Sequence, residues 1–418
     1  MDKWKLYLKL LIFIVFSALS IGIEFYYRNH LNEYSLTWIK EIQTNSSKSL
    51  LGFFKIISEF GSQGLLIPLI VLTYLLFPLN KAYLFLNVTI LALVIDSIMK
   101  ITYGNPRPFW IDSTLFKACD GGFGNPSGHA YVSSASYLTL GHILTDYDFF
   151  KKRIYIRVVV YILFIGLTIT ILLSRLFLGF HSINQILYGS LLGSSLYFLF
   201  THIFQLHTMN GEVFFSLFSK KIMIIFIAGF QIILFAISLL VFFLVPNDTS
   251  AYEENLNKLC PNLNLYRKFN NDGLYGCLTL LGLIGAHYGI LSMLNFLKKR
   301  DIKNLDAILE WNKTKLIFRL YILGLMICFA SSLIMMLVIS GKADLTIIFI
   351  FKVGLPYLIT CFGIYGLNVY FCIRLKIANP MLNDLITVIS FGESYVKRGD
   401  LEENNVILPV NKIKINKK

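Results

Sequence analysis

The chain has 418 residues, of which 56% are hydrophobic and only 15% are charged. Soluble domains carry about 25% charged residues, so this composition excludes an ordinary soluble protein and predicts a membrane protein. The formal net charge of +14 is explained by basic loops on one membrane face, and we predict no nucleic-acid partner.

Ten apolar stretches of about 20 residues predict an all-α, integral membrane helical bundle. They lie at residues 8–27, 62–79, 82–100, 129–146, 156–174, 183–204, 222–245, 274–297, 316–340 and 345–373. Ten spans place both termini on one side, and the loops on that side carry the larger number of Lys and Arg residues. The positive-inside rule therefore predicts cytosolic termini. Sequons for N-glycosylation at Asn45 and Asn247 fall on the opposite, lumenal or extracellular face.

The three longest segments between the predicted spans all lie on the lumenal or extracellular face. Residues 28–61 are predicted to be a polar loop that ends in either an interfacial helix or the entry turn of the second span. Residues 101–127 are rich in Gly and Pro, which suits a loop that brings backbone N–H groups close to an anion. Residues 246–273 form a polar loop on the same face. Cys119, Cys260 and Cys277 lie in or near these segments, and the sequence leaves open which of them, if any, form a disulfide.

Three short motifs place ionisable side chains at the edges of membrane spans. They read KITYGNPRP (Lys100–Pro108), NPSGH (Asn125–His129) and SRLFLGFHSINQ (Ser174–Gln185). Charged groups at that depth are costly, so their presence indicates function. Another ionisable residue at membrane depth, Asp96, is predicted only to hydrogen-bond neighbouring helices.

Hydrolysis of a phosphate ester requires groups of the kinds that these motifs supply. The phosphate oxygens need cations and N–H donors, phosphorus needs a nucleophile, and the leaving oxygen needs a proton. His181 and His129 would share the roles of nucleophile and acid. The predicted phosphate-binding residues are Lys100, Arg107, Ser127, Gly128 and Arg175.

Other kinds of site and protein are weaker interpretations of the same residues. We predict neither a metal nor a cofactor, because Asp112 and Asp120 are the only carboxylates in the motif loop. A serine triad is not favoured, because His129 follows Ser127 too closely to act as its base. A transporter is also possible, but the charged residues cluster in one half of the chain. An inactive scaffold is a further alternative.

In these motifs the chain resembles the type 2 phosphatidic acid phosphatase (PAP2) superfamily. The matching signature is Lys-(six residues)-Arg-Pro, then Pro-Ser-Gly-His, then Ser-Arg-(five residues)-His. The resemblance covers residues 62–204 and implies a catalytic core of six helices, with the first span as the sixth. It implies that His181 attacks phosphorus and forms a phosphohistidine, and that His129 protonates the leaving group.

The sequence departs from the superfamily pattern at Gln185, where most members have an aspartate that orients the nucleophilic histidine. A glutamine there could still orient His181, or it could merely cap or pack within the sixth span. This glutamine, the Phe109-Trp110 pair and Cys119 are similar to glucose-6-phosphatases. The His181-Ser-Ile sequence is closer to sphingosine-phosphate phosphatases.

We therefore predict a membrane phosphatase that hydrolyses lipid phosphates, such as phosphatidic acid or a sphingoid-base phosphate. A sugar phosphatase similar to glucose-6-phosphatase is the alternative. The expected location is the endoplasmic reticulum, another endomembrane or the plasma membrane, with a lumenal or extracellular active site. The expected parts are a six-span core (1–205), four further spans (206–375) and a cytosolic tail (376–418).

Overall fold

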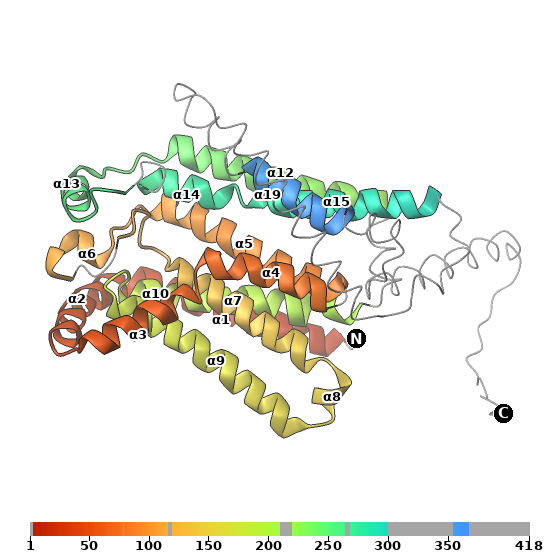
Figure 1. Ribbon diagram of the computed structural model, residues 1–418, viewed down its shortest axis with the longest axis horizontal. Helices are drawn as coiled ribbons and strands as arrows, with labels where there is room; N and C mark the ends of the chain where they lie inside the picture. Colours follow the sequence, from red (N-terminus) through yellow and green to blue (C-terminus); the bar gives the residue numbers. More distant parts are fainter. Residues whose placement is uncertain are drawn as a thin grey trace, which may run out of the picture.

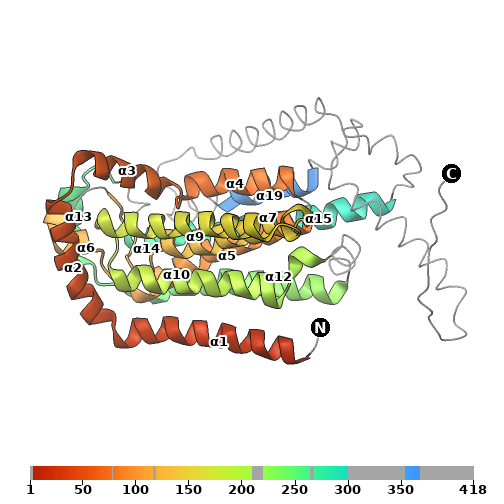
Figure 2. The same ribbon diagram turned by 90° about the horizontal axis from the view of Figure 1, so that it is seen from below.

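The computed structural model describes residues 3–77, 79–115, 119–209, 220–263, 268–299 and 354–367. In these ranges the chain is helical, and its only β interaction is an isolated bridge between Gly121 and Lys268. The long helices lie side by side and share one overall direction (Figures 1 and 2). The prediction of an all-α, multi-pass membrane bundle is confirmed.

Six of the described helical segments are long and apolar enough to cross a membrane. They are Trp4–Tyr26, Asn80–Ile111, Ile154–Phe177, Ile183–Thr208, Lys221–Leu244 and Phe269–Met293. A seventh crossing is possible for helices α3 (Lys48–Glu59) and α4 (Gln63–Leu76), which are bent by 44° at their junction. The predicted span 316–340 lies outside the described residues. Of the predicted span 345–373, only α19 (Leu355–Phe362) and η6 (Gly363–Leu367) are described, so the count of ten stays a prediction.

Helix α5 (Leu79–Tyr103) runs through the interior of the bundle, where residues 81–94 are all buried. Helix α7 (Gly128–Thr145) packs against it, and Thr89 and Ser136 form a hydrogen bond of 2.9 Å between them. The serines and threonines of α7 keep it out of the six apolar segments, although a span was predicted at 129–146. Helix α9 (Ile154–Phe177) is different: only 11% of its apolar window is buried, as suits a helix that faces lipid.

Helix α10 (Ile183–Phe198) lies in close contact with α7 because it carries glycines where the two backbones meet. A Cβ atom on Gly189 would lie 2.7 Å from the carbonyl oxygen of Ser127, and one on Gly193 would lie 2.2 Å from that of Tyr131. Small residues at such positions let membrane helices approach closely. The contact brings the start of α7 beside the start of α10, where two of the three motifs lie. Helix α1 (Lys3–Tyr26) packs along α10.

Four of the shorter helices gather at one end of the bundle. Helices α2 (Arg28–Thr44), α3, α6 (Pro108–Ile111) and α13 (Ser250–Leu259) lie there, whereas the start of α1 and α8 (Asp148–Lys151) lie at the other end (Figure 1). The prediction of a polar loop at 28–61 is wrong for the first part of the segment, which forms α2. The end of the segment forms helix α3, and whether α3 lies at the interface or enters the membrane stays a prediction. The Ser47 hydroxyl caps α3 by accepting a hydrogen bond of 3.2 Å from the N–H of Leu50.

The second half of the chain packs directly on α5. Helices α12 (Lys221–Leu244) and α14 (Phe269–Cys277) both contact it, and so does α15 (Leu280–Lys299). Gly273 lies against Ile101, and Gly276 lies against Ser97. The predicted division of the chain after residue 205 stays a prediction.

Candidate active site

His181 lies in the short connection between α9 and α10, where it is only 1% exposed. Its Nδ1 atom is 2.8 Å from the carbonyl oxygen of Gly124 and 3.2 Å from Oε1 of Gln185. Both partners are acceptors, so we assign the ring proton to Nδ1. Nε2 then has a lone pair, which accepts a hydrogen bond of 3.1 Å from Nη1 of Arg107.

The surroundings of His181 keep its ring neutral. Burial lowers the pKa of His181 well below its usual range, and the positive charges of Arg107, Arg175 and Lys100 lower it further. A neutral imidazole with its Nε2 lone pair directed at a cation has the form of a nucleophile held at an anion site.

Gln185 makes three hydrogen bonds within the site. Its Oε1 accepts from the backbone N–H of Ser182 at 3.3 Å as part of a capping box, and it also faces His181. Its Nε2 donates to the carbonyl oxygen of Pro106 at 3.1 Å. Gln185 therefore makes both contacts that the sequence left open: it caps α10, and it contacts the ring of His181.

Arg107 and Arg175 come from different helices and are both buried. Arg107 precedes α6, and its Nε donates to the carbonyl oxygen of Gly122. Arg175 lies in the last turn of α9, and its Nη1 donates to Oγ of Ser58 at 2.7 Å. The Arg175 guanidinium also lies 3.8 Å from the centre of the Phe180 ring.

Asp120 joins the two arginines and was not predicted as a site residue. Its Oδ2 is 3.0 Å from Nη2 of Arg107 and 3.7 Å from Nη2 of Arg175. The other carboxylate of the loop, Asp112, instead accepts hydrogen bonds from Thr114 and pairs with Lys40. The sequence offers no signal that separates these two acids.

Lys100 is paired within its own helix, because its Nζ lies 3.0 Å from Oδ2 of Asp96. Asp96 therefore contacts a predicted site residue, which the sequence analysis did not anticipate. A Cβ atom on Gly128 would lie 2.6 Å from Asp96 Oδ2 and 2.9 Å from Lys100 Nζ. Glycine at 128 thus lets the start of α7 approach this ion pair closely.

Two buried donors near these residues have no hydrogen-bond partner among the residues that the structure describes, namely Oγ of Ser127 and Nε of Arg175. Buried polar groups are normally paired, so such atoms indicate where a ligand belongs. An anion would satisfy both of them. No described residues form a group of three or more His, Cys, Asp or Glu that could hold a metal ion.

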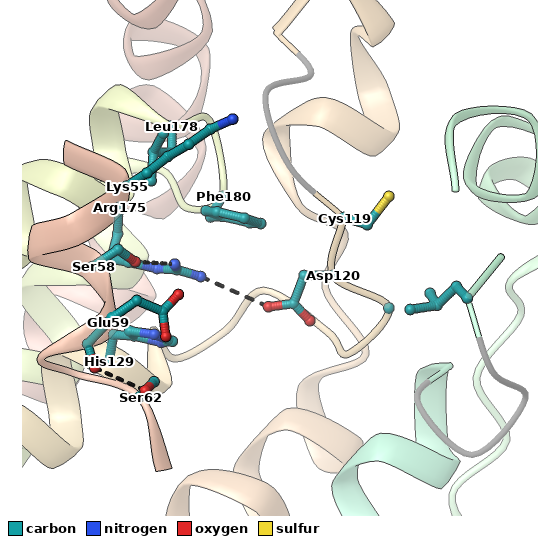
Figure 3. Close-up of a pocket in the computed structure, with 12 residues that line it drawn as sticks. Lys55, Ser58, Glu59, Ser62, Cys119, Asp120, His129, Arg175, Leu178 and Phe180 are labelled. Carbon is teal, nitrogen blue, oxygen red and sulfur yellow. Dashed lines mark hydrogen bonds and ion pairs between the residues drawn. The ribbon is translucent and has the colours of Figure 1, made fainter. Parts of the chain in front are cut away.

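A pocket of about 440 Å³ opens beside Arg175 and His129 (Figure 3). Its lining residues come from α3, the motif loops and the 246–273 segment: Lys55, Ser58, Glu59, Ser62, Cys119, Asp120, Gly121, His129, Arg175, Leu178, Phe180 and Leu263. His129 enters from the first turn of α7, and Figure 3 places it beside Glu59 and near Arg175. The pocket is thus lined by two predicted site residues and by the polar face of α3.

The 246–273 segment is fastened onto the motif loop. Cys119 and Cys260 form a disulfide, and Cys277 is buried as a free thiol. The Phe269 N–H donates to the carbonyl oxygen of Gly121 at 2.7 Å. Asn247, in the predicted sequon, donates to the carbonyl oxygen of Ile101 at 2.8 Å, so its side chain is engaged in this attachment.

Comparison with known proteins gives one family. Residues 81–209 match the model of the PAP2 superfamily. A search of curated proteins finds no match. Among solved structures, the first transmembrane PAP2-type phosphatidylglycerolphosphate phosphatase from Bacillus subtilis is similar, with 21% sequence identity and a TM-score of 0.40. The likeness covers 48% of this chain and 96% of that one.

The matched residues contain all three motifs, from Lys100 to Gln185. The predicted resemblance is confirmed at the level of the superfamily, and with it the class of phosphoric monoester hydrolase. The chain is a multi-pass membrane protein whose residues 81–209 match the PAP2 superfamily.

Proposed function

We propose that the protein is a lipid phosphate phosphatase that works through a phosphohistidine and needs no metal. The observation that carries this proposal is the state of His181, whose Nε2 lone pair faces Arg107 while its Nδ1–H is held by Gly124 and Gln185. The guanidinium groups of Arg107 and Arg175 supply the charge that a metal would otherwise provide.

In the first step, Nε2 of His181 attacks phosphorus. The N–P bond forms while the bond from phosphorus to the substrate oxygen breaks, and His129 gives its proton to that oxygen. Arg107, Arg175 and Lys100 balance the charge on the peripheral oxygens. Ser127 Oγ and Arg175 Nε, which have no partner among the described residues, become donors to the phosphoryl group.

In the second step, a water molecule replaces the alcohol. His129, now neutral, takes a proton from the water as its oxygen attacks phosphorus. The N–P bond breaks, and its electron pair returns to Nε2 of His181. Inorganic phosphate leaves and the site is restored.

Helix α3 supports a lipid as the substrate. Its residues Lys55, Ser58 and Glu59 line the pocket. Its other side exposes Phe53 (48%) and Ile56 (65%), which suits contact with acyl chains. A phosphorylated lipid could therefore lie against α3 with its headgroup in the pocket.

A sugar phosphate is the second candidate. Ser58, Glu59 and Ser62 give the pocket wall near His129 a polar character that fits a hydroxylated leaving group. For either substrate we propose a core of α1, α4, α5, α7, α9 and α10. We also propose that the site faces the lumen or the exterior, since it lies at the end opposite the start of α1 (Figure 1).

Purified full-length protein should release phosphate from phosphatidic acid or sphingosine phosphate faster than from glucose-6-phosphate. EDTA should leave the rate unchanged, and orthovanadate should inhibit, because a five-coordinate vanadate fits the arginine cluster. Phosphate release from the three substrates, with and without EDTA, is the measurement. A higher rate on glucose-6-phosphate would select the second candidate, and loss of activity in EDTA that magnesium restores would contradict the mechanism.

His129→Ala should slow hydrolysis of alkyl phosphates by about 10²- to 10⁴-fold, because the alkoxide then leaves without a proton. An aryl phosphate with an acidic phenol needs no such proton, so it should still give a rapid burst of phenol followed by slow turnover. Stopped-flow absorbance measures the burst. His142→Ala is the matched control, since His142 lies on the same helix but contacts Tyr161 and His207. Equal loss of the burst and of turnover of alkyl phosphates in His129→Ala would contradict the assignment of His129 as the proton donor.

Gln185→Glu should move the acidic limb of the pH–rate profile to higher pH. A carboxylate beside Nδ1 favours the protonated ring and so raises the pKa of His181. Because only the neutral ring attacks, activity is lost as pH falls through that pKa. The maximal rate should stay within about tenfold, or about 1.4 kcal/mol of barrier.

Gln185→Leu should lose more activity than Gln185→Glu, because it removes the acceptor facing His181. The pH dependence of kcat/KM in both variants is the measurement. An unchanged profile in Gln185→Glu, together with full activity in Gln185→Leu, would reduce Gln185 to a helix cap.

A further inference from the structure

We propose that Asp120 holds the place of the substrate phosphate before substrate binds and exchanges with it in each turnover. The carboxylate would thereby weaken the binding of inorganic phosphate and speed its release. This inference rests on the proposed function, because it assumes that Arg107 and Arg175 bind phosphate.

The position of Asp120 is that of a bridging anion. A single oxygen, Oδ2, lies 3.0 Å from Arg107 and 3.7 Å from Arg175, as a phosphoryl oxygen between two guanidinium groups would. The Asp120 side chain is 26% exposed, whereas those of the two arginines are 1% and 4% exposed. In Figure 3 the carboxylate faces Arg175 across the pocket that also receives His129.

The remaining donors of the arginines show why both anions compete for one place. Arg107 uses Nε for Gly122 and directs Nη1 to His181, so Nη2 is the nitrogen that Asp120 takes. Arg175 uses Nη1 for Ser58 and places Nη2 toward Asp120. A phosphoryl group that binds these Nη2 atoms must displace the carboxylate, because two anions on the same donors repel each other.

The positive charge of the two arginines explains why an internal anion is present. Two buried guanidinium groups that face one pocket repel each other, and a buried charge without a counterion is strongly destabilising. Asp120 supplies the counterion until the substrate arrives. Once a phosphate dianion is bound, the same carboxylate is an unfavourable neighbour.

The backbone around Asp120 is held in place, so the exchange requires rotation of the side chain and loss of the 3.2 Å hydrogen bond that Asp120 Oδ1 accepts from the N–H of Gly122. Cys119 is bonded to Cys260, and the carbonyl oxygen of Gly121 accepts from Phe269. The Asp120 carbonyl oxygen accepts from Nε1 of Trp110 at 3.3 Å. The displaced carboxylate therefore stays beside the arginines and can return when the product forms.

The test compares the affinity for inorganic phosphate in Asp120→Asn and in the wild type. The full-length protein hydrolyses a chromogenic aryl phosphate while inorganic phosphate is added as a competitive inhibitor. The inhibition constant should fall at least about tenfold in Asp120→Asn, because the competing charge is gone. The value of kcat should not rise, since the product then leaves more slowly.

Two further variants serve as controls. Asp112→Asn removes a carboxylate of the same loop that pairs outside the site, and it should match the wild type. Asp120→Glu retains the charge and should keep the inhibition constant near that of the wild type. Asp120→Ser also lacks the charge and should reproduce Asp120→Asn.

Several outcomes would overturn the inference. An unchanged or larger inhibition constant in folded Asp120→Asn or Asp120→Ser would show that Asp120 only braces the arginines. If neither Asp120→Asn nor Asp120→Ser folds, the role of Asp120 is to stabilise the folded protein instead. Wild-type protein that neither turns over the substrate nor responds to phosphate would instead refute the proposed function, and the inference with it.

Discussion

The site depends on the need to keep two buried guanidinium groups, those of Arg107 and Arg175, at the edge of a membrane bundle. Such charges persist only where hydrogen bonds and counterions satisfy them. The protein meets this requirement with the carbonyl oxygen of Gly122, the hydroxyl of Ser58 and the carboxylate of Asp120. Gly122 and Asp120 come from the motif loop and Ser58 comes from α3, so the loop and α3 must both be in place before the cations are stable. The arrangement of the proposed phosphate site therefore follows from one electrostatic constraint.

The same constraint gives a role to the segment after α12. Its disulfide to Cys119 and its backbone contact at Gly121 fasten the loop that carries Asp120. On the other side of the site, Gly124 and Gln185 fix the ring of His181 through Nδ1. The loop backbone and the ring of His181 are therefore both held in place. The side chains beside them would exchange partners when an anion binds. Preorganisation of this kind is the largest source of catalysis in most enzymes.

Motif spacing was sufficient to predict the superfamily, and apolar length was sufficient to predict a helical membrane bundle. Three features of the structure could not be predicted from the sequence, each for a physical reason. Helix α2 is too polar to register as a span, so the first part of the 28–61 segment was taken for a loop. Asp120 follows no periodic pattern, and only its contact with two arginines distinguishes it from Asp112. Finally, the sequence could not show which of Cys119, Cys260 and Cys277 form a disulfide, because pairing depends on their proximity in three dimensions.

The central claim is that His181 carries the phosphoryl group between the two steps. Its most direct test is to quench the wild-type enzyme during turnover of a ³²P-labelled phosphomonoester and to locate the label by peptide mapping. The account predicts a phosphoenzyme that is stable in alkali and labile in acid, with the phosphoryl group on the peptide that contains His181. Label on a peptide that contains Ser127 or His129 but not His181, or stoichiometric turnover with no phosphoenzyme, would contradict it.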